Sequence, residues 1–431
     1  MHETTLEVAS QGQAFLAGAI FLITYALIVS ERVHRTIAAL LGGFVMILLH
    51  VVTQEQAFHS IDFNVIFLLA GMMIIAHILS ETGLFQWIAI QAVKLGRRDP
   101  FRIMIFLCLV TAIASAALDN VTVVVLLAPV TLFVASNLHI SPIPFLIAEV
   151  LSSNIGGAST LIGDPPNILI GSAANIDFIT FAANMTPPLL VVLVLFIPLS
   201  YFVFRQELTP LEEGRPRVSG LETGEIITDQ TLLVKSLSVI GLVLIGFTMH
   251  SILHLEPATI AMAGATILML ISRKDPHHVL QHVEWTTLFF FVGLFITVEA
   301  LVLTGIIKAI ADGVLAFTGG NLPLTTMIVL WLSAFASGIV DNIPYTATMI
   351  PLIKELGNVG MNTEPMWWAL ALGADLGGNF TLVGASANVV VASLAERSGY
   401  RISFMRFLKY SFVITLMSIL VSMLYLWLFH L

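Results

Sequence analysis

A polar break rich in glycine and proline interrupts an apolar stretch at residues 152–167, which read SSNIGGASTLIGDPPN. Apolar residues flank it on both sides, PFLIAEVL before and ILIGSAA after. Non-helical backbone of this kind cannot face lipid, because every unpaired N–H or C=O group in hydrocarbon costs several kcal/mol. The break must therefore line a protein-buried or watery cavity if the flanking runs lie in a membrane.

The same kind of break returns at residues 374–388, which read ADLGGNFTLVGASAN. Five residue pairs match at one offset of 221 positions: Asn154 and Asp375, Gly156 and Gly377, Thr160 and Thr381, Gly163 and Gly384, Asn167 and Asn388. Two broken helices in corresponding positions of two halves indicate the binding site of a transporter.

Composition places the chain in a bilayer. Of 431 residues, 58% are hydrophobic and 10% are charged, whereas soluble domains average about 45–50% and about 25%. Apolar runs near the ~20 residues that a spanning helix needs predict an all-α polytopic membrane protein. The single cysteine, Cys108, rules out a disulfide within the chain and a thiol metal cluster. No basic run suggests nucleic acid, no P-loop motif occurs, and we expect no cofactor and no metal.

The polar segment 207–231 is the natural boundary between two repeats. We expect a first repeat at 1–206, a cytoplasmic linker at 207–231 and a second repeat at 232–431, each with about five spans, a helical hairpin and a broken helix. All but Lys308 and Lys354 of the 18 basic residues then fall on one face. The positive-inside rule makes that face cytoplasmic and both termini external in the inner (plasma) membrane. An odd number of spans per half makes the repeats inverted, whether the hairpin arms span or re-enter.

The hairpin tips, Asp119-Asn120 and Asp341-Asn342, place carboxylates amid apolar sequence. An aspartate at the centre of a membrane helix costs about 2.5–3.5 kcal/mol, so it faces a cavity, a partner or a cation, or carries a proton. These residues are coupling groups or turn caps, and both roles can hold together. Asp375 stands where the first half has Asn154, which adds a carboxylate to one side.

The segment Gly163-Asp164-Pro165 predicts the start of a half-helix inside the membrane. The Asp164 carboxylate suits an N-cap that accepts from free N–H groups, and Pro165 suits the first helical position. Such a helix end attracts an anion or the oxygens of a neutral oxyacid; the alternative is a kink stabilised by its neighbours. His77, Glu149 and Glu299, within apolar segments, are coupling groups or helix contacts.

The chain resembles the arsenical pump membrane protein and P-protein permeases of the ion transporter superfamily, which also holds citrate-transporter-like proteins, sodium/dicarboxylate symporters and NhaD-type antiporters. The resemblance rests on LDNVTVVVLLAPVT, SSNIGGASTLIGDPPNILIG, VDNIPYTATMIPLI and GADLGGNFTLVGASANVVVA. It implies an inverted-repeat fold with a scaffold and a transport domain. It also implies substrate contact by a set of tip and loop residues: Asn120, Thr122, Asn154, Thr160, Gly163, Pro165, Asn167, Asn342, Asn379, Thr381 and Asn388.

The tips depart from the Ser-Asn-Thr of the dicarboxylate symporters, because this chain has Asp-Asn-Val and Asp-Asn-Ile. A carboxylate there repels a carboxylate substrate. The tips therefore favour a cation or a neutral solute with proton exchange. Together with the resemblance, this implies a secondary transporter rather than an enzyme: a proton-coupled exporter (antiporter) of arsenite and antimonite, with proton exchange at Asp119, Asp341 and Asp375. The alternatives are a sodium/proton antiporter of the NhaD kind and an anion or dicarboxylate transporter of the P-protein or citrate-transporter kind. A separate soluble arsenite-stimulated ATPase subunit is a further possible partner.

Overall fold

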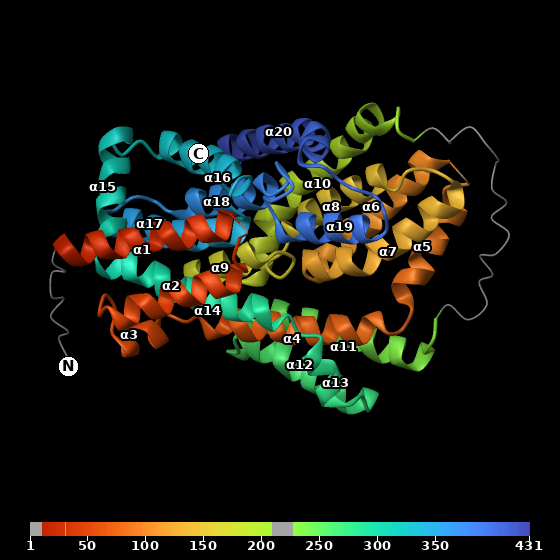
Figure 1. Cartoon of the computed structure of the whole chain (residues 1–431), viewed down its shortest axis with the longest axis horizontal. Coiled ribbons are helices and arrows are strands. Elements are labelled where there is room, and N and C mark those ends of the chain that lie inside the picture. The colour runs from red at the N-terminus through yellow and green to blue at the C-terminus, as the bar shows by residue number, and fades with distance from the viewer. Residues whose placement is uncertain (1–10, 31, 98, 209–226) are drawn as a thin grey trace.

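The computed structural model describes residues 11–30, 32–97, 99–208 and 227–431, and every regular element in these ranges is a helix (Figure 1). The first half contains α1 (Gln11–Ser30), α2 (Arg35–Leu48), α3 (Gln54–His59), α4 (Phe63–Ser80), α5 (Leu84–Leu95), α6 (Pro100–Ala117), α7 (Asn120–Leu138), α8 (Ile143–Gly157), α9 (Pro165–Ala174) and α10 (Phe178–Phe204). The second half contains α11 (Gln230–Leu253), α12 (Pro257–Ser272), α13 (Pro276–Gln281), α14 (Trp285–Leu303), α15 (Ile306–Thr318), α16 (Leu322–Ser337), α17 (Asn342–Asn358), α18 (Glu364–Gly377), α19 (Ser386–Arg397) and α20 (Phe404–Phe429).

The order of elements is the same in both halves, and local sequence explains why. Gly83 and Gly305 adopt the left-handed conformation, with φ of 80° and 77°, and turn the chain from α4 into α5 and from α14 into α15. Glycine enters this region without steric cost. The fold is thus the predicted all-α membrane protein built from two inverted repeats. By length and hydropathy, seven of the described helices can cross a bilayer: α1, α4, α6, α10, α11, α14 and α20.

Four helices cross closely to form the scaffold: α2 packs on α14, and α4 packs on α12. The contacts need glycine. A Cβ on Gly71 of α4 would meet the backbone of Ala261 in α12, and one on Gly293 of α14 would meet the backbone of Ala39 in α2. The two crossings are equivalent positions of the repeats, so each half supplies one glycine and one alanine.

We expect Gly293→Ala to destabilise the protein by about 1–3 kcal/mol, because overpacking forces backbone shifts. Gly313→Ala in α15 is the matched control, since its Cβ would meet nothing within 4 Å. Alanine is favoured over glycine in a helix by roughly 0.5–1 kcal/mol, so the control should be neutral or stabilising. Thermal unfolding of both variants in detergent measures the difference. Equal midpoints would contradict the close crossing.

The transport domain consists of the two hairpins, α6–α7 and α16–α17, and the two broken helices, α8–α9 and α18–α19. Figure 1 shows α5 to α7 at one end of the long axis and α15 to α17 at the other. The segments between α8 and α9 and between α18 and α19 are not helical, as predicted from the repeated breaks. Helices α10 and α20 pack on each other and on the broken helices.

The predicted linker 207–231 falls mainly on residues 209–226, which lie outside the described residues. Of its described ends, Glu207 forms an ion pair with Arg406 of α20 at 2.5 Å and accepts a hydrogen bond from Tyr410. Helix α11 already begins at Gln230. The boundaries of the two repeats and of the linker remain predictions.

Candidate substrate and ion site

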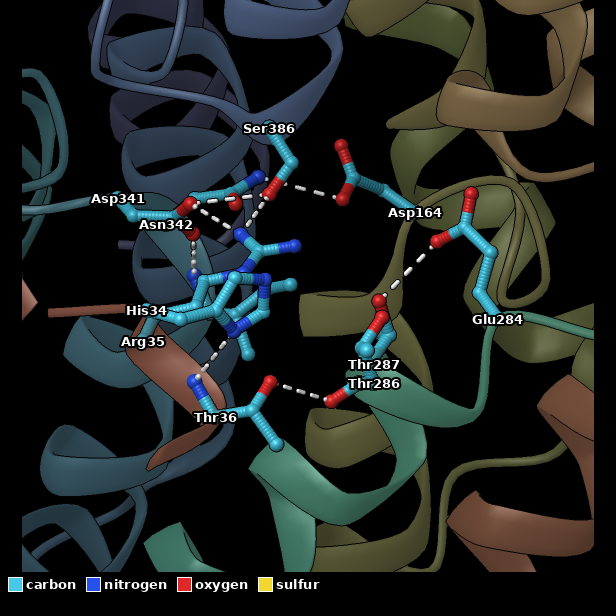
Figure 2. Close-up of polar contacts among 11 residues, drawn as sticks. His34, Arg35, Thr36, Asp164, Glu284, Thr286, Thr287, Asp341, Asn342 and Ser386 are labelled. Carbon is cyan, nitrogen blue, oxygen red and sulfur yellow. Dashed lines mark hydrogen bonds and ion pairs between the residues drawn. The ribbon is translucent and has the colours of Figure 1, made fainter. Parts of the chain in front are cut away.

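Asp164 connects the two hairpin tips. One carboxylate oxygen accepts a hydrogen bond from the Asn120 amide at 2.8 Å. The other accepts from Asn342 at 3.2 Å, as Figure 2 shows. Asp164 occupies the N-cap position of α9, as predicted, but its carboxylate makes no capping bond. Pro165 and Pro166 have no N–H to offer. The first available donor, the Asn167 N–H, already bonds the Asp164 carbonyl at 3.0 Å. The carboxylate is therefore free to face the tips.

Asn154 lies at the centre, where both halves meet. Its amide donates to the side-chain oxygens of Asn379 at 2.8 Å and Asn388 at 3.1 Å, and its oxygen accepts from Asn120 at 3.1 Å. Asn379 in turn donates to the Leu151 carbonyl at 3.3 Å. Four carboxamides from four elements thus form one buried network, which fixes the transport domain as a unit.

Matching bonds hold each broken helix against its hairpin. The Asn120 N–H donates to the Gly163 carbonyl at 3.1 Å, and the Asn342 N–H donates to the Gly384 carbonyl at 3.2 Å. The Thr160 and Thr381 hydroxyls reach the carbonyls of the preceding hairpin arms, Ala116 at 2.6 Å and Gly338 at 2.5 Å.

The unwound loops are closed in the same way by Asn167 and Asn388. Their amides donate to the Thr160 and Thr381 carbonyls, both at 2.9 Å. The donor groups of these side chains are therefore engaged within the fold. Thr122 offers its backbone N–H to the Asp119 carboxylate at 3.0 Å, as a cap of α7. The structure brings the predicted residues together, and their contact with a solute remains a prediction.

The two aspartates at the hairpin tips differ in backbone and partners. Asp119 caps α7 with φ of −64°, whereas Asp341 caps α17 through the Ile343 N–H at 3.1 Å with φ of 76°. A positive φ is costly for a residue with a Cβ and persists only where surrounding contacts enforce it.

Those contacts come from Arg35 of α2 and from Ser386. The Arg35 guanidinium lies 3.1 Å from the Asp341 carboxylate and also donates to the Ser386 hydroxyl, and Ser386 donates to Asp341 at 3.0 Å (Figure 2). Because α2 belongs to the scaffold, this ion pair joins scaffold and transport domain at the second tip. Asp119 has no ion pair among the described residues.

The centre holds an excess of buried acceptor oxygens. Neither carboxylate oxygen of the fully buried Asp375 accepts a hydrogen bond of good geometry from the described residues. The Asn167 amide lies near Asp375 but donates to the Gly157 and Thr160 carbonyls. Three more acceptors in this region are likewise unpartnered: Asp119 Oδ2, Asn120 Oδ1 and Asn167 Oδ1. The charge of Asp164 interacts with that of Asp375, and no lysine or arginine described here pairs with either. Unpaired buried acceptors cost about 1–3 kcal/mol each, which a bound donor or cation would offset.

Two cavities lie against elements of the transport domain. One, of about 280 Å³, lies against the second tip and is lined by Arg35, Asp341, Ser386 and Glu284 among others. The other, of about 450 Å³, is lined by α9 and the loop before it, together with His250 of α11 and Glu256, the N-cap of α12. The first cavity thus reaches the second hairpin tip at Asp341, and the second reaches α9, the half-helix that follows Asp164.

Two residues of the site were missed by the sequence reasoning. Arg35 entered only the count of basic residues, and Asp164 was interpreted only as a helix cap. Both lack a copy in the other half: the positions that correspond to them hold Pro257 and Ala385. The sequence did hold a signal for both: each is a charged residue whose counterpart in the other repeat is uncharged. Glu149 accepts from Thr131 at 2.8 Å inside the core, which favours the helix-contact interpretation.

The fold and the buried polar centre define a multi-pass membrane transporter. The citrate transporter family profile matches residues 25–373, and the chain belongs to this family. An uncharacterised transporter of Mycobacterium tuberculosis is 47% identical over 96% of this chain and 98% of its own length. The human P protein is 35% identical over 97% of this chain, which spans 60% of that protein.

A solved structure shares the fold. The YdaH transporter of Alcanivorax borkumensis matches with a TM-score of 0.60 at 14% identity, covering 97% of this chain and 98% of that one. The mycobacterial relatives at 46–47% identity that carry a functional name are named as transporters.

Proposed function

We propose that this transporter is a proton-coupled exporter of a small neutral oxyacid, with arsenite and antimonite as its substrates. The observation that carries the proposal is the excess of unpartnered acceptor oxygens at Asp119, Asn120, Asn167 and Asp375. At neutral pH arsenite is a trihydroxide with three O–H donors. It complements a site rich in acceptors, whereas an oxyanion would meet like charges.

Proton coupling is supported by the pair Asp164 and Asp375. Two interacting carboxylates in a buried site cannot both stay charged without a cation, since each desolvated charge needs compensation. When no solute is bound, the pair therefore holds a proton or a cation. A solute that donates hydrogen bonds favours the charged carboxylates and displaces the proton, which gives antiport.

A sodium/proton antiporter is the second candidate, because oxygen ligands also suit a hard cation. The family description favours a third, an anion or dicarboxylate transporter. Against the third stand Asp164 and Asp375, because no described lysine or arginine pairs with either buried carboxylate and their charges would repel a carboxylate substrate. Orientation is part of the proposal: the basic face cytoplasmic, both termini external, in the plasma membrane. A soluble arsenite-stimulated ATPase subunit, if one associates, would bind the cytoplasmic loops.

Everted membrane vesicles distinguish the candidates. We expect arsenite uptake that requires an imposed proton gradient, ceases with a protonophore and is absent from vesicles without the protein. In a second arm, sodium is added to the vesicles and a pH-sensitive dye reports proton movement. In a third arm, uptake of citrate or succinate is measured. Sodium-evoked pH changes without arsenite uptake would replace the proposal by the second candidate, and gradient-driven dicarboxylate uptake would replace it by the third.

A further inference from the structure

A group of three histidines lies outside the transport site, between α4 and α13. His77 belongs to the last turns of α4, His278 lies in α13, and His282 is the C-cap of α13. One ring nitrogen of each falls within 4.8 Å of the others. The two helices come from different halves, so the cluster spans a contact within the scaffold.

The local sequence places these rings together. His278 and His282 are four residues apart, so they lie on one face of a helical turn. Asp275 caps α13 through the His277 N–H at 3.1 Å, and Pro276 starts the helix. The corresponding positions of the other half hold Gln56, Ser60 and Glu299. The repeated helix packing therefore does not itself require histidines.

Hydrogen bonding leaves ligand nitrogens available. His282 Nδ1 donates to the His278 carbonyl at 2.8 Å, because a carbonyl can only accept, and this leaves Nε2 with a free lone pair. Histidines that ligate metals commonly donate their other ring N–H to a backbone carbonyl in this way. His77 Nε2 is buried without a hydrogen bond from the described residues.

A carboxylate completes the surroundings. Glu81 Oε1 lies 3.4 Å from His77 Nε2 and 3.8 Å from His278 Nδ1, while Oε2 forms an ion pair with Lys274 at 2.6 Å. The rings of His77 and His282 stack at 3.9 Å between centroids, so a metal would rotate them out of this arrangement. His278 is 56% exposed and His282 is exposed, so both can turn.

We propose that His77, His278 and His282 form a binding site for a divalent transition metal, with Zn²⁺ as its ligand. Three imidazoles with a neighbouring carboxylate or water suit Zn²⁺, Ni²⁺ and Cu²⁺ rather than Mg²⁺ or Ca²⁺. The bound ion joins α4 of the first half to α13 of the second. It lies on the face predicted to be cytoplasmic and outside the transport centre.

The test uses the purified full chain in detergent, freed of any polyhistidine tag. Zn²⁺ binding is measured by calorimetry, and Co²⁺ gives visible ligand-field bands that report imidazole coordination. We expect one metal per chain and a raised thermal midpoint with Zn²⁺, because a ligand that binds only the folded state stabilises it. His278→Ala and His282→Ala each remove a ligand, so each should weaken binding by at least the roughly tenfold to hundredfold that the loss of an outer-shell partner costs.

His277→Ala is the matched control. It removes an exposed histidine of the same short helix; His277 bonds Gln281 and does not belong to the cluster. The affinity for Zn²⁺ should therefore stay within about twofold, as expected for a surface substitution. The two test histidines are exposed, so their variants should fold, and their thermal midpoints without metal check this. Wild-type protein that binds no Zn²⁺, or equal affinity in all variants, would overturn the site.

Discussion

Asp375→Asn is expected to abolish transport driven by a proton gradient while the protein stays folded. The substitution keeps the shape of the side chain and removes its titratable group. Because neither oxygen of Asp375 accepts a hydrogen bond of good geometry from the described residues, no donor loses its partner. Replacing a buried, unpaired carboxylate by a neutral amide should leave the free energy of unfolding unchanged or raise it by about 1–3 kcal/mol.

The measurement separates coupling from binding. In everted vesicles, gradient-driven arsenite uptake should fall to the background of vesicles without the protein. Exchange of internal for external arsenite at zero gradient should persist, since the carboxamide of the variant would still offer an acceptor oxygen to the solute. Asp312→Asn, an exposed carboxylate of α15, serves as the control and should behave as wild type. Full gradient-driven uptake by Asp375→Asn would remove this residue from proton exchange.

The recurrence of polar residues in the two repeats explains why the fold was predictable. Polar residues such as Asn154 and Asp375 recur at one offset inside apolar sequence, and only a polar cavity can hold them in a membrane. Their recurrence predicted the hairpins, the broken helices and their meeting point. The glycines that allow close crossings, Gly71 and Gly293, recur at an offset of 222 positions, one more than the broken helices.

The pairings across the site could not be read from the sequence. Asp164 bonds Asn342 across 178 positions, and Arg35 pairs with Asp341 across 306. No periodicity reports these contacts, because one partner of each pair, Asp164 or Arg35, lacks a copy in the other half. The prediction of a capping bond at Asp164 was wrong because two prolines follow it, so the rule that favours proline at the start of a helix removed the donors that the cap rule needed.

Arg35→Gln is expected to destabilise the protein by about 1–3 kcal/mol and to impair transport, because it leaves the Asp341 carboxylate without its cation. The Arg35 and Asp341 side chains are 29% and 15% exposed, so solvent screening keeps the cost below that of a fully buried pair. The backbone at Asp341, with φ of 76°, also loses the contact that holds it.

A double-mutant cycle tests this prediction. Arg35→Gln with Asp341→Asn should recover more than half of the lost thermal stability, because no unpaired charge remains and asparagine tolerates positive φ. Transport should stay impaired in the double variant, since the ion pair that joins scaffold to transport domain is absent. The exposed Arg401→Gln controls for loss of positive charge. Purely additive midpoints would mean that Arg35 and Asp341 act independently. Asp341 would then hold its strained backbone through Ser386 and the Ile343 N–H alone.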